Sequence, residues 1–180
     1  MEFDKILRTD DLSEYYVDWL DEDIVVDWMK CAEYLIDKHN YNQIVVEHKK
    51  LADGRNEKFK VGIQTRDVDV SKVANSLQDK RIVEDAGIAM GLLIIQWLRP
   101  LKFIRVLKTG DGYDYYYLPR NSNEEELIEM TGTEIPNGGT ERLRSKIRKF
   151  KDKHPDTSGY ISVSCFYDKV QIHWGHRNDS

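Results

Sequence analysis

The spacing of apolar and polar residues predicts where the longer helices lie. Residues 21–39 carry apolar side chains at helical spacing and begin with acidic residues, which favour a helix N-terminus. Residues 81–100 are apolar on nearly every side and end at a proline, so this segment predicts a helix buried against a sheet. Residues 140–154 predict another helix, because Thr140 is a suitable N-cap and Pro155 lies just beyond the last turn.

Runs of β-branched, aromatic and alternating residues predict the strands. Residues 42–65 contain two such runs around Asp53 and Gly54, a pattern typical of a β-hairpin. Residues 1–20 show no regular pattern beyond weak helical character, although several of their apolar side chains are expected to pack on the body of the protein. Further strands are expected at 102–109, 113–119, 125–132, 159–167 and 169–176.

The order of these elements predicts an α/β fold in a single domain that spans residues 1–180. Residues 81–180 form a helix, three strands, a helix and a strand, with one more strand appended. A helical crossover joins the third and fourth of these strands, so the sheet is expected to be mixed. Residues 1–80 add an N-terminal helix and a β-hairpin to this core.

Composition narrows the class of protein. The chain has 180 residues, of which 40% are hydrophobic and 33% charged, and this is long enough for one globular core. Acidic residues outnumber basic ones, 32 to 27, which excludes a strong overall basic field but leaves room for a local basic groove. Cys31 and Cys165 lie far apart in apolar settings and are expected to be buried free thiols. No apolar run approaches the roughly 18 residues of a membrane helix, and the N-terminus is unlike a signal peptide, so we expect a cytoplasmic protein.

Two carboxylates are notable for their positions in the predicted strands. Asp114 follows a Gly-Asp-Gly turn at the start of strand 113–119, where β-propensity disfavours aspartate. Glu129 lies in strand 125–132, with Thr131 two residues on and on the same face. Carboxylates on neighbouring strands can lie close enough to bridge a hard cation such as Mg²⁺, which prefers oxygen ligands. The alternative is that Asp114 only ends a turn and that Glu129 is an exposed charge on an edge strand.

Glu84 lies in the first turn of the predicted helix 81–100. It shares a face with Gly87 and Gly91, whose lack of a side chain lets the helix approach the sheet closely. We therefore expect Glu84 to point to the sheet or its rim, where a carboxylate needs a cation or hydrogen-bond donors. The alternative is that Glu84 and Asp85 only interact with the helix dipole.

The order of elements over residues 81–167, together with the motifs VED, GDGYD and IEMTG, resembles the restriction-endonuclease-like PD-(D/E)XK superfamily. The resemblance implies a core in which Asp114 and Glu129 hold Mg²⁺, helped by the backbone carbonyl of Met130. It also implies that Glu84 is the helix glutamate of that site.

The sequence departs from the superfamily at Thr131, where the motif has a lysine. A threonine hydroxyl supplies no positive charge to orient the attacking water or to neutralise the scissile phosphate. Lys146 or Lys149, on the helix that follows, is the alternative source of that charge. The resemblance implies a Mg²⁺-dependent phosphodiester hydrolase that acts on DNA. The alternative is a catalytically inactive relative that serves as a protein-interaction, immunity or regulatory module, which Thr131 and the acidic pI favour.

A literal Glu-x-Lys motif occurs elsewhere, as Glu47 and Lys49. It follows an apolar run, as the superfamily motif often does, but no preceding strand offers an aspartate. The alternative is that these residues form a cross-strand pair with Glu57 or Lys58 in the predicted hairpin.

Three further features carry weaker signals. The helix 140–154 has seven basic residues, which form either a solvated outer face or a phosphate-contacting surface beside the metal site. Residues 136–143 place two glycines before that helix, a pattern typical of a loop or of an anion site. His173 and His176 lack the helical spacing of a zinc motif and are expected to be structural or incidental.

Overall fold

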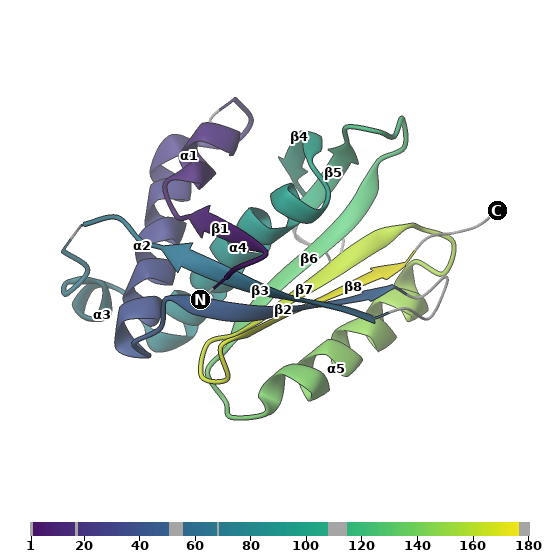
Figure 1. Cartoon of the computed structure of the whole chain (residues 1–180). Coiled ribbons are helices and arrows are strands. Elements are labelled where there is room, and N and C mark those ends of the chain that lie inside the picture. Colours follow the sequence, from purple (N-terminus) through teal and green to yellow (C-terminus); the bar gives the residue numbers. More distant parts are fainter. Residues whose placement is uncertain (1, 17, 51–55, 68, 108–114, 177–180) are drawn as a thin grey trace.

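The computed structural model describes residues 2–16, 18–50, 56–67, 69–107 and 115–176, with the side chains of residues 50 and 176 left out (Figure 1). At its centre is an eight-stranded mixed sheet with the strand order β1-β3-β2-β8-β7-β6-β5-β4. The strands are β1 (Lys5–Arg8), β2 (Gln43–Lys50), β3 (Asn56–Gln64), β4 (Leu101–Val106), β5 (Tyr115–Pro119), β6 (Glu126–Thr133), β7 (Gly159–Cys165) and β8 (Val170–His176). The helices are α1 (Asp11–Tyr16), α2 (Glu22–Lys38), α3 (Val73–Ser76), α4 (Asp79–Leu98) and α5 (Gly138–Lys153).

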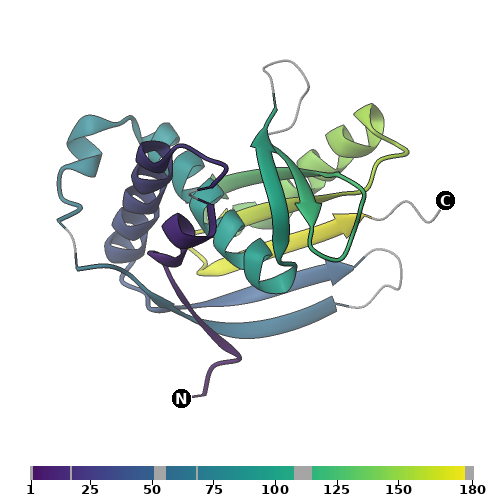
Figure 2. The same ribbon diagram turned by 90° about the horizontal axis from the view of Figure 1, so that it is seen from above.

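The long helices lie on opposite faces of the sheet (Figures 1 and 2). Helix α4 crosses one face, with α2 packed on its outer side, and α5 covers the other face. Gly87 of α4 approaches β6 so closely that a Cβ atom there would lie 2.3 Å from the backbone nitrogen of Gly132. Helix α2 begins where Asp21 accepts hydrogen bonds from the backbone of the first turn, as expected of an N-cap.

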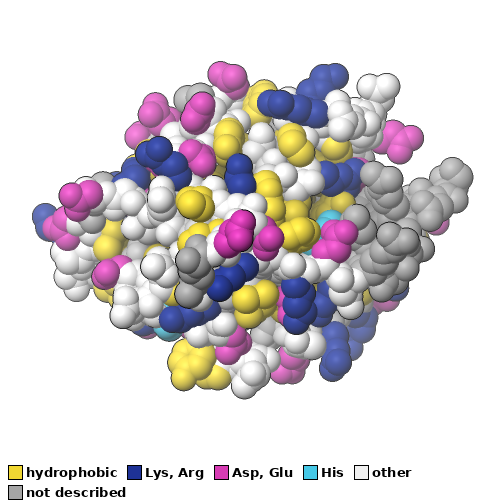
Figure 3. Space-filling model, viewed as in Figure 1, with side chains coloured by type: hydrophobic (Ala, Val, Ile, Leu, Met, Phe, Trp, Pro, Cys, Tyr) yellow, Lys and Arg dark blue, Asp and Glu magenta, His cyan; other side chains and the backbone are white. Residues whose placement is uncertain are grey.

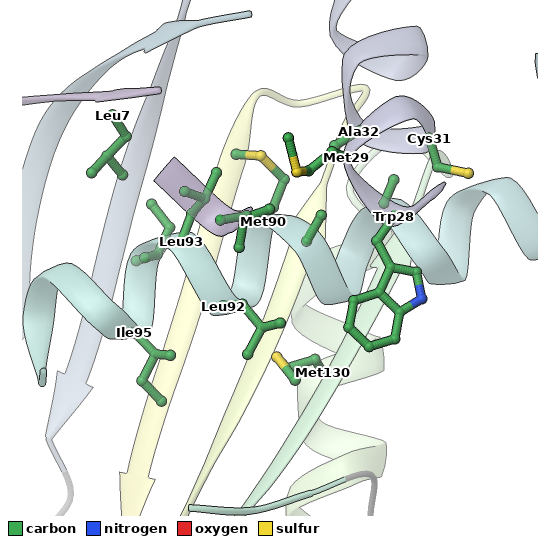
Figure 4. Close-up of a cluster of buried hydrophobic side chains, with 14 of the residues drawn as sticks. Leu7, Trp28, Met29, Cys31, Ala32, Met90, Leu92, Leu93, Ile95 and Met130 are labelled. Carbon is green, nitrogen blue, oxygen red and sulfur yellow. The ribbon is translucent and has the colours of Figure 1, made fainter. Parts of the chain in front are cut away.

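The larger core lies between α4, α2 and the sheet (Figure 4). Met90 and Leu92 of α4 pack near Trp28 and Met29 of α2, and all four side chains are buried. Met130 of β6 reaches the same cluster from the sheet. A second, smaller apolar cluster lies under α5, with Leu143 and Phe150 among its buried members. The sheet therefore has a buried core on each face.

Strand β6 lies in the interior of the sheet and is buried along its whole length. It pairs with β5 in antiparallel and with β7 in parallel orientation, and α5 is the crossover between β6 and β7. Alternate residues of a strand point to opposite faces. Met130 lies under Gly91 of α4, whereas Leu127 belongs to the cluster under α5. Glu129 and Thr131 share the face of Leu127 and therefore point toward α5.

The sequence predicted most of these elements correctly. The helices expected at 21–39, 81–100 and 140–154 are confirmed as α2, α4 and α5, and the crossover makes the sheet mixed as expected. The expectation of no regular structure beyond weak helical character in residues 1–20 is wrong for β1, which pairs in parallel with β3 at one edge of the sheet. The N-terminal hairpin is more than an addition to the core, because β2 pairs with β8 and extends the same sheet.

No helix in the described part of the chain combines the length and the apolar character that a membrane span requires.

Candidate functional site

A carboxylate and an ammonium group meet between β6 and α5. Glu129 points from β6 toward the helix, and its side chain is only 8% exposed. Lys146, 17 residues later on α5, donates a hydrogen bond from Nζ to Glu129 Oε1 and is 25% exposed. The alternative that Glu129 is an exposed charge on an edge strand is therefore wrong. The sequence-based candidate Lys146 lies beside Glu129, on the helix that was expected to carry it.

A second polar contact lies next to this pair. Arg142 Nε donates a hydrogen bond to Thr131 Oγ1 at 3.0 Å, and the Thr131 side chain is buried. Two residues along a strand advance about 6.6 Å, and four residues along a helix advance about 6 Å. Because α5 runs antiparallel to β6 and these two advances are similar, the contacts Glu129–Lys146 and Thr131–Arg142 can form side by side.

Apolar side chains flank these contacts on the same face. Leu127 of β6, Ile161 and Val163 of β7, and Leu143 and Phe150 of α5 are all buried there. Charges in such surroundings interact more strongly than in water, but they are also costly to bury without a partner. The structure meets this requirement by bringing the Lys146 ammonium to the Glu129 carboxylate.

The structure places Glu84 elsewhere, and the expectation that it points to the sheet is wrong. Its side chain is 48% exposed, and Lys80 lies one helical turn away with Nζ 4.0 Å from Oε1. Helix α4 packs on the face of β6 opposite to Glu129, so the structure does not bring Glu84 together with the pair under α5. The contact with β6 is made instead by Gly87 and by the carbonyl of Val83, which lies 2.0 Å from a Cβ built on Gly132.

The buried carboxylate in the first half of α4 is the neighbouring residue, Asp85. It accepts a hydrogen bond from Arg81 Nε at 3.2 Å, and burial raises the pKa of Asp85. The sequence analysis did not predict the pairing with Arg81, although Arg81 and Asp85 have the i, i+4 spacing of a helical ion pair.

Asp114, the second predicted metal ligand, lies outside the described residues. That Asp114 and Glu129 share an ion therefore stays a prediction. Among the residues that the structure describes, no three His, Cys, Asp or Glu side chains gather in a way that would hold a metal ion.

The competing Glu-x-Lys motif has a structural explanation. Glu47 and Lys58 are cross-strand partners in the β2–β3 hairpin, with Lys58 Nζ 2.7 Å from Glu47 Oε1. Lys49 Nζ is 3.7 Å from the other carboxylate oxygen. The cross-strand alternative is thus confirmed for Lys58.

The other residues that the sequence singled out are mostly buried. Cys31 and Cys165 are buried free thiols, as expected, and burial raises the pKa of each to about 12. Gly138 and Gly139 form the start of α5, and a Cβ atom on Gly139 would lie 2.1 Å from Cys165 Sγ, so packing requires the glycine at this position. His173 is fully buried, neither of its ring nitrogens has a hydrogen-bond partner among the residues that the structure describes, and burial lowers its pKa to about 3. The side chain of His176 is outside the described part of the structure.

A buried ion pair on the α4 side of the sheet was missed by sequence reasoning. Arg99, the residue directly after α4, contacts both carboxylate oxygens of Glu126 at the start of β6. The hydroxyl of Tyr117 donates to Glu126 Oε2 at 2.5 Å, and the Arg99 guanidinium lies 4.7 Å from the centre of the Tyr160 ring. This cluster fixes the end of α4 to the sheet. Its partners come from four separate elements, so no local pattern could have indicated it.

Comparisons of this chain with models of protein families, with curated proteins and with solved structures give no match. The functional argument therefore depends on the geometry at β6 and α5.

Proposed function

We propose that the protein is a Mg²⁺-dependent phosphodiester hydrolase with a restriction-endonuclease-like core, acting on DNA. The observation that carries the proposal is the Glu129–Lys146 pair between β6 and α5, in which the Glu129 side chain is 8% exposed and the Lys146 side chain 25%. The element order supports it as well. Helix α4, the antiparallel strands β4, β5 and β6, helix α5 and the parallel strand β7 follow one another in the order that the sequence resemblance implies.

Glu129 is suited to the metal-binding role. A carboxylate oxygen is the ligand type that Mg²⁺ prefers, and one or two carboxylates with backbone and substrate oxygens complete such sites. Glu129 would hold the ion together with the Met130 carbonyl and Asp114. When bound, the ion would supply charge stabilisation at the phosphate and a more acidic water.

Lys146 is suited to the role of the missing motif lysine. Its ammonium lies beside the carboxylate of the strand glutamate, although it comes from the following helix. In this place a positive charge balances the charge that develops on a phosphate under attack and helps to orient the attacking water. Thr131 meanwhile accepts the hydrogen bond of Arg142, so the motif position holds a second cation of α5 in place.

A second candidate function is a catalytically inactive relative that acts as a protein-interaction, immunity or regulatory module. The exposed position of Glu84 favours this candidate, because the residue that would be the helix glutamate of the superfamily site then lies away from the Glu129–Lys146 pair. The net charge of −5 also favours it, since a polyanionic substrate gains no overall attraction.

Cleavage under single-turnover conditions separates the two candidates. Plasmid DNA and single- and double-stranded oligonucleotides are incubated with excess protein and Mg²⁺ or Mn²⁺. We expect slow cleavage by the wild type, a loss of about 100-fold or more in Glu129→Gln, and a near-normal rate in the control Glu84→Gln. If no substrate is cleaved with either metal, the hydrolase proposal is wrong and the interaction module takes its place.

A further inference from the structure

The basic residues of α5 form two separate rows. Arg142, Lys146, Lys149 and Lys153 recur at i, i+4, i+7 and i+11, a spacing that places them on one side of a helix. We name these four residues the β6-side stripe. With a rise of 1.5 Å per residue, the stripe is about 16 Å long.

Contacts in the structure define which way this stripe faces. Its first two members reach β6, where Arg142 binds Thr131 and Lys146 binds Glu129. Lys149 and Lys153 continue the same side of the helix toward its C-terminus, and both are exposed. In the described part of the chain, neither of these two lysines has an acidic side chain within ion-pair distance. The stripe therefore begins at the candidate site and continues into solvent.

The other row lies on the opposite side of the helix. Arg144, Arg148 and Lys151 recur at i, i+4 and i+7 and are also exposed. Glu141 and Asp152 lie between the two rows on the outer surface of α5. Two of its members, Arg144 and Arg148, match the charge and exposure of Lys149 and Lys153 but do not lead to Glu129, so this pair is a matched internal control.

We propose that the β6-side stripe binds the sugar–phosphate backbone of a nucleic-acid strand and guides it along α5 to Glu129. In Figure 3, Lys and Arg side chains gather at the lower right, over the region of α5. At about 3.4 Å per nucleotide, a stripe of about 16 Å matches roughly five nucleotides of one strand. The inference rests on the proposed function for the chemistry at Glu129. It adds how the substrate is held, by several phosphates on one side of the cleaved bond.

Local charge explains how an acidic protein would bind a polyanion. The chain carries 27 basic and 32 acidic residues overall, whereas α5 has seven basic residues against Glu141 and Asp152. Each phosphate that a cation neutralises contributes about 0.9 to the salt slope of binding on duplex DNA and about 0.7 on a single strand. Removing two cations of the stripe should therefore lower that slope by roughly 1.4 to 1.8.

The test measures binding of fluorescent oligonucleotides in EDTA, so that cleavage does not interfere, between about 50 and 200 mM salt. The pair Lys149→Gln/Lys153→Gln is compared with the control pair Arg144→Gln/Arg148→Gln, which removes the same charge from the other row. We expect the stripe variant to bind about tenfold or more weakly than the wild type at low salt, and its salt slope to fall by the full roughly 1.4 to 1.8. The control variant should keep the wild-type slope. Equal losses in both variants, or a wild type that does not bind, would overturn the proposal.

A second arm separates this inference from the proposed function. Wild-type protein with Mg²⁺ is given a dinucleotide and a longer strand of the same sequence at equal concentration of phosphodiester bonds. Faster cleavage of the longer strand, lost in the stripe variant alone, supports the inference, and equal cleavage of both overturns it. If binding behaves as expected but nothing is cleaved, the stripe stands as a binding surface and the hydrolase proposal fails.

Discussion

Replacing Lys146 by methionine tests whether the pair under α5 is as buried as the structure indicates. Methionine keeps the apolar stem of the side chain but removes the ammonium from Glu129, whose side chain is 8% exposed. Removing one partner of a fully buried pair costs about 3–5 kcal/mol. The Lys146 side chain is 25% exposed, so water can partly replace the ammonium, and we expect the lower end, about 3 kcal/mol. For a chain of this length, that corresponds to a fall in Tm of roughly 6–12 °C.

Urea unfolding and thermal melts of three variants provide the measurement. The double variant Glu129→Leu/Lys146→Met removes both charges and should be within about 1 kcal/mol of the wild type, because apolar groups can replace a buried pair. Lys149→Met, one turn further along α5 at an exposed position, should change stability by less than about 0.5 kcal/mol. If Lys146→Met is as stable as Lys149→Met, the pair is not buried and the reasoning is wrong.

Three other changes test separate parts of the fold. Gly87→Ala should lower the free energy of unfolding by about 3 kcal/mol or more, because its Cβ would lie 2.3 Å from the backbone of β6. In Gly91→Ala the Cβ would lie 2.8 Å from the flexible side chain of Met130, so this variant should lose only about 1 kcal/mol. Burial lowers the pKa of His173 to about 3, whereas the imidazole in the unfolded chain binds a proton once the pH falls below about 6.5. Protonation between pH 7 and pH 5 therefore favours the unfolded chain, and urea unfolding should show about 2 kcal/mol less stability at pH 5 than at pH 7. The variant His173→Leu should lack this loss. Thr131→Lys should lower thermal stability and any cleavage rate, because it puts an ammonium beside the Arg142 guanidinium. A higher cleavage rate would show that the role of the motif lysine is unfilled and that Lys146 does not supply it.

The pattern of apolar residues was sufficient to predict the longer elements of the fold. Helix α4 is buried because residues 81–100 are apolar on nearly every side, and the crossover α5 follows from strand and helix order alone. The first strand, β1, has four residues and a single buried side chain, Leu7, so its local pattern is too short to indicate a strand. Its place in the sheet depends on pairing with β3, far along the chain.

The candidate site was only partly predictable, for a similar reason. The alternation of side chains along a strand places Glu129 and Thr131 on one face of β6. Lys146 is a candidate partner because it lies on the helix that follows this strand. Which side of α4 packs on the sheet depends on the close approach of Gly87 to β6, and this approach leaves Glu84 on a side of the helix that is exposed to solvent. Spacing along one helix does not report such a contact, because it is decided by the shape of the opposite surface.

The effect of Glu129 and Lys146 on the cleavage rate tests the central claim most directly. Single-turnover rates on one duplex substrate with Mg²⁺ are measured for the wild type, Glu129→Gln, Lys146→Met and the double variant, at a temperature where all four are folded. If the two residues act as a unit at the cleaved bond, each single variant loses about 100-fold or more, and the double variant loses less than about tenfold beyond that. A wild type without activity, or single variants that cleave at the wild-type rate, would contradict the account.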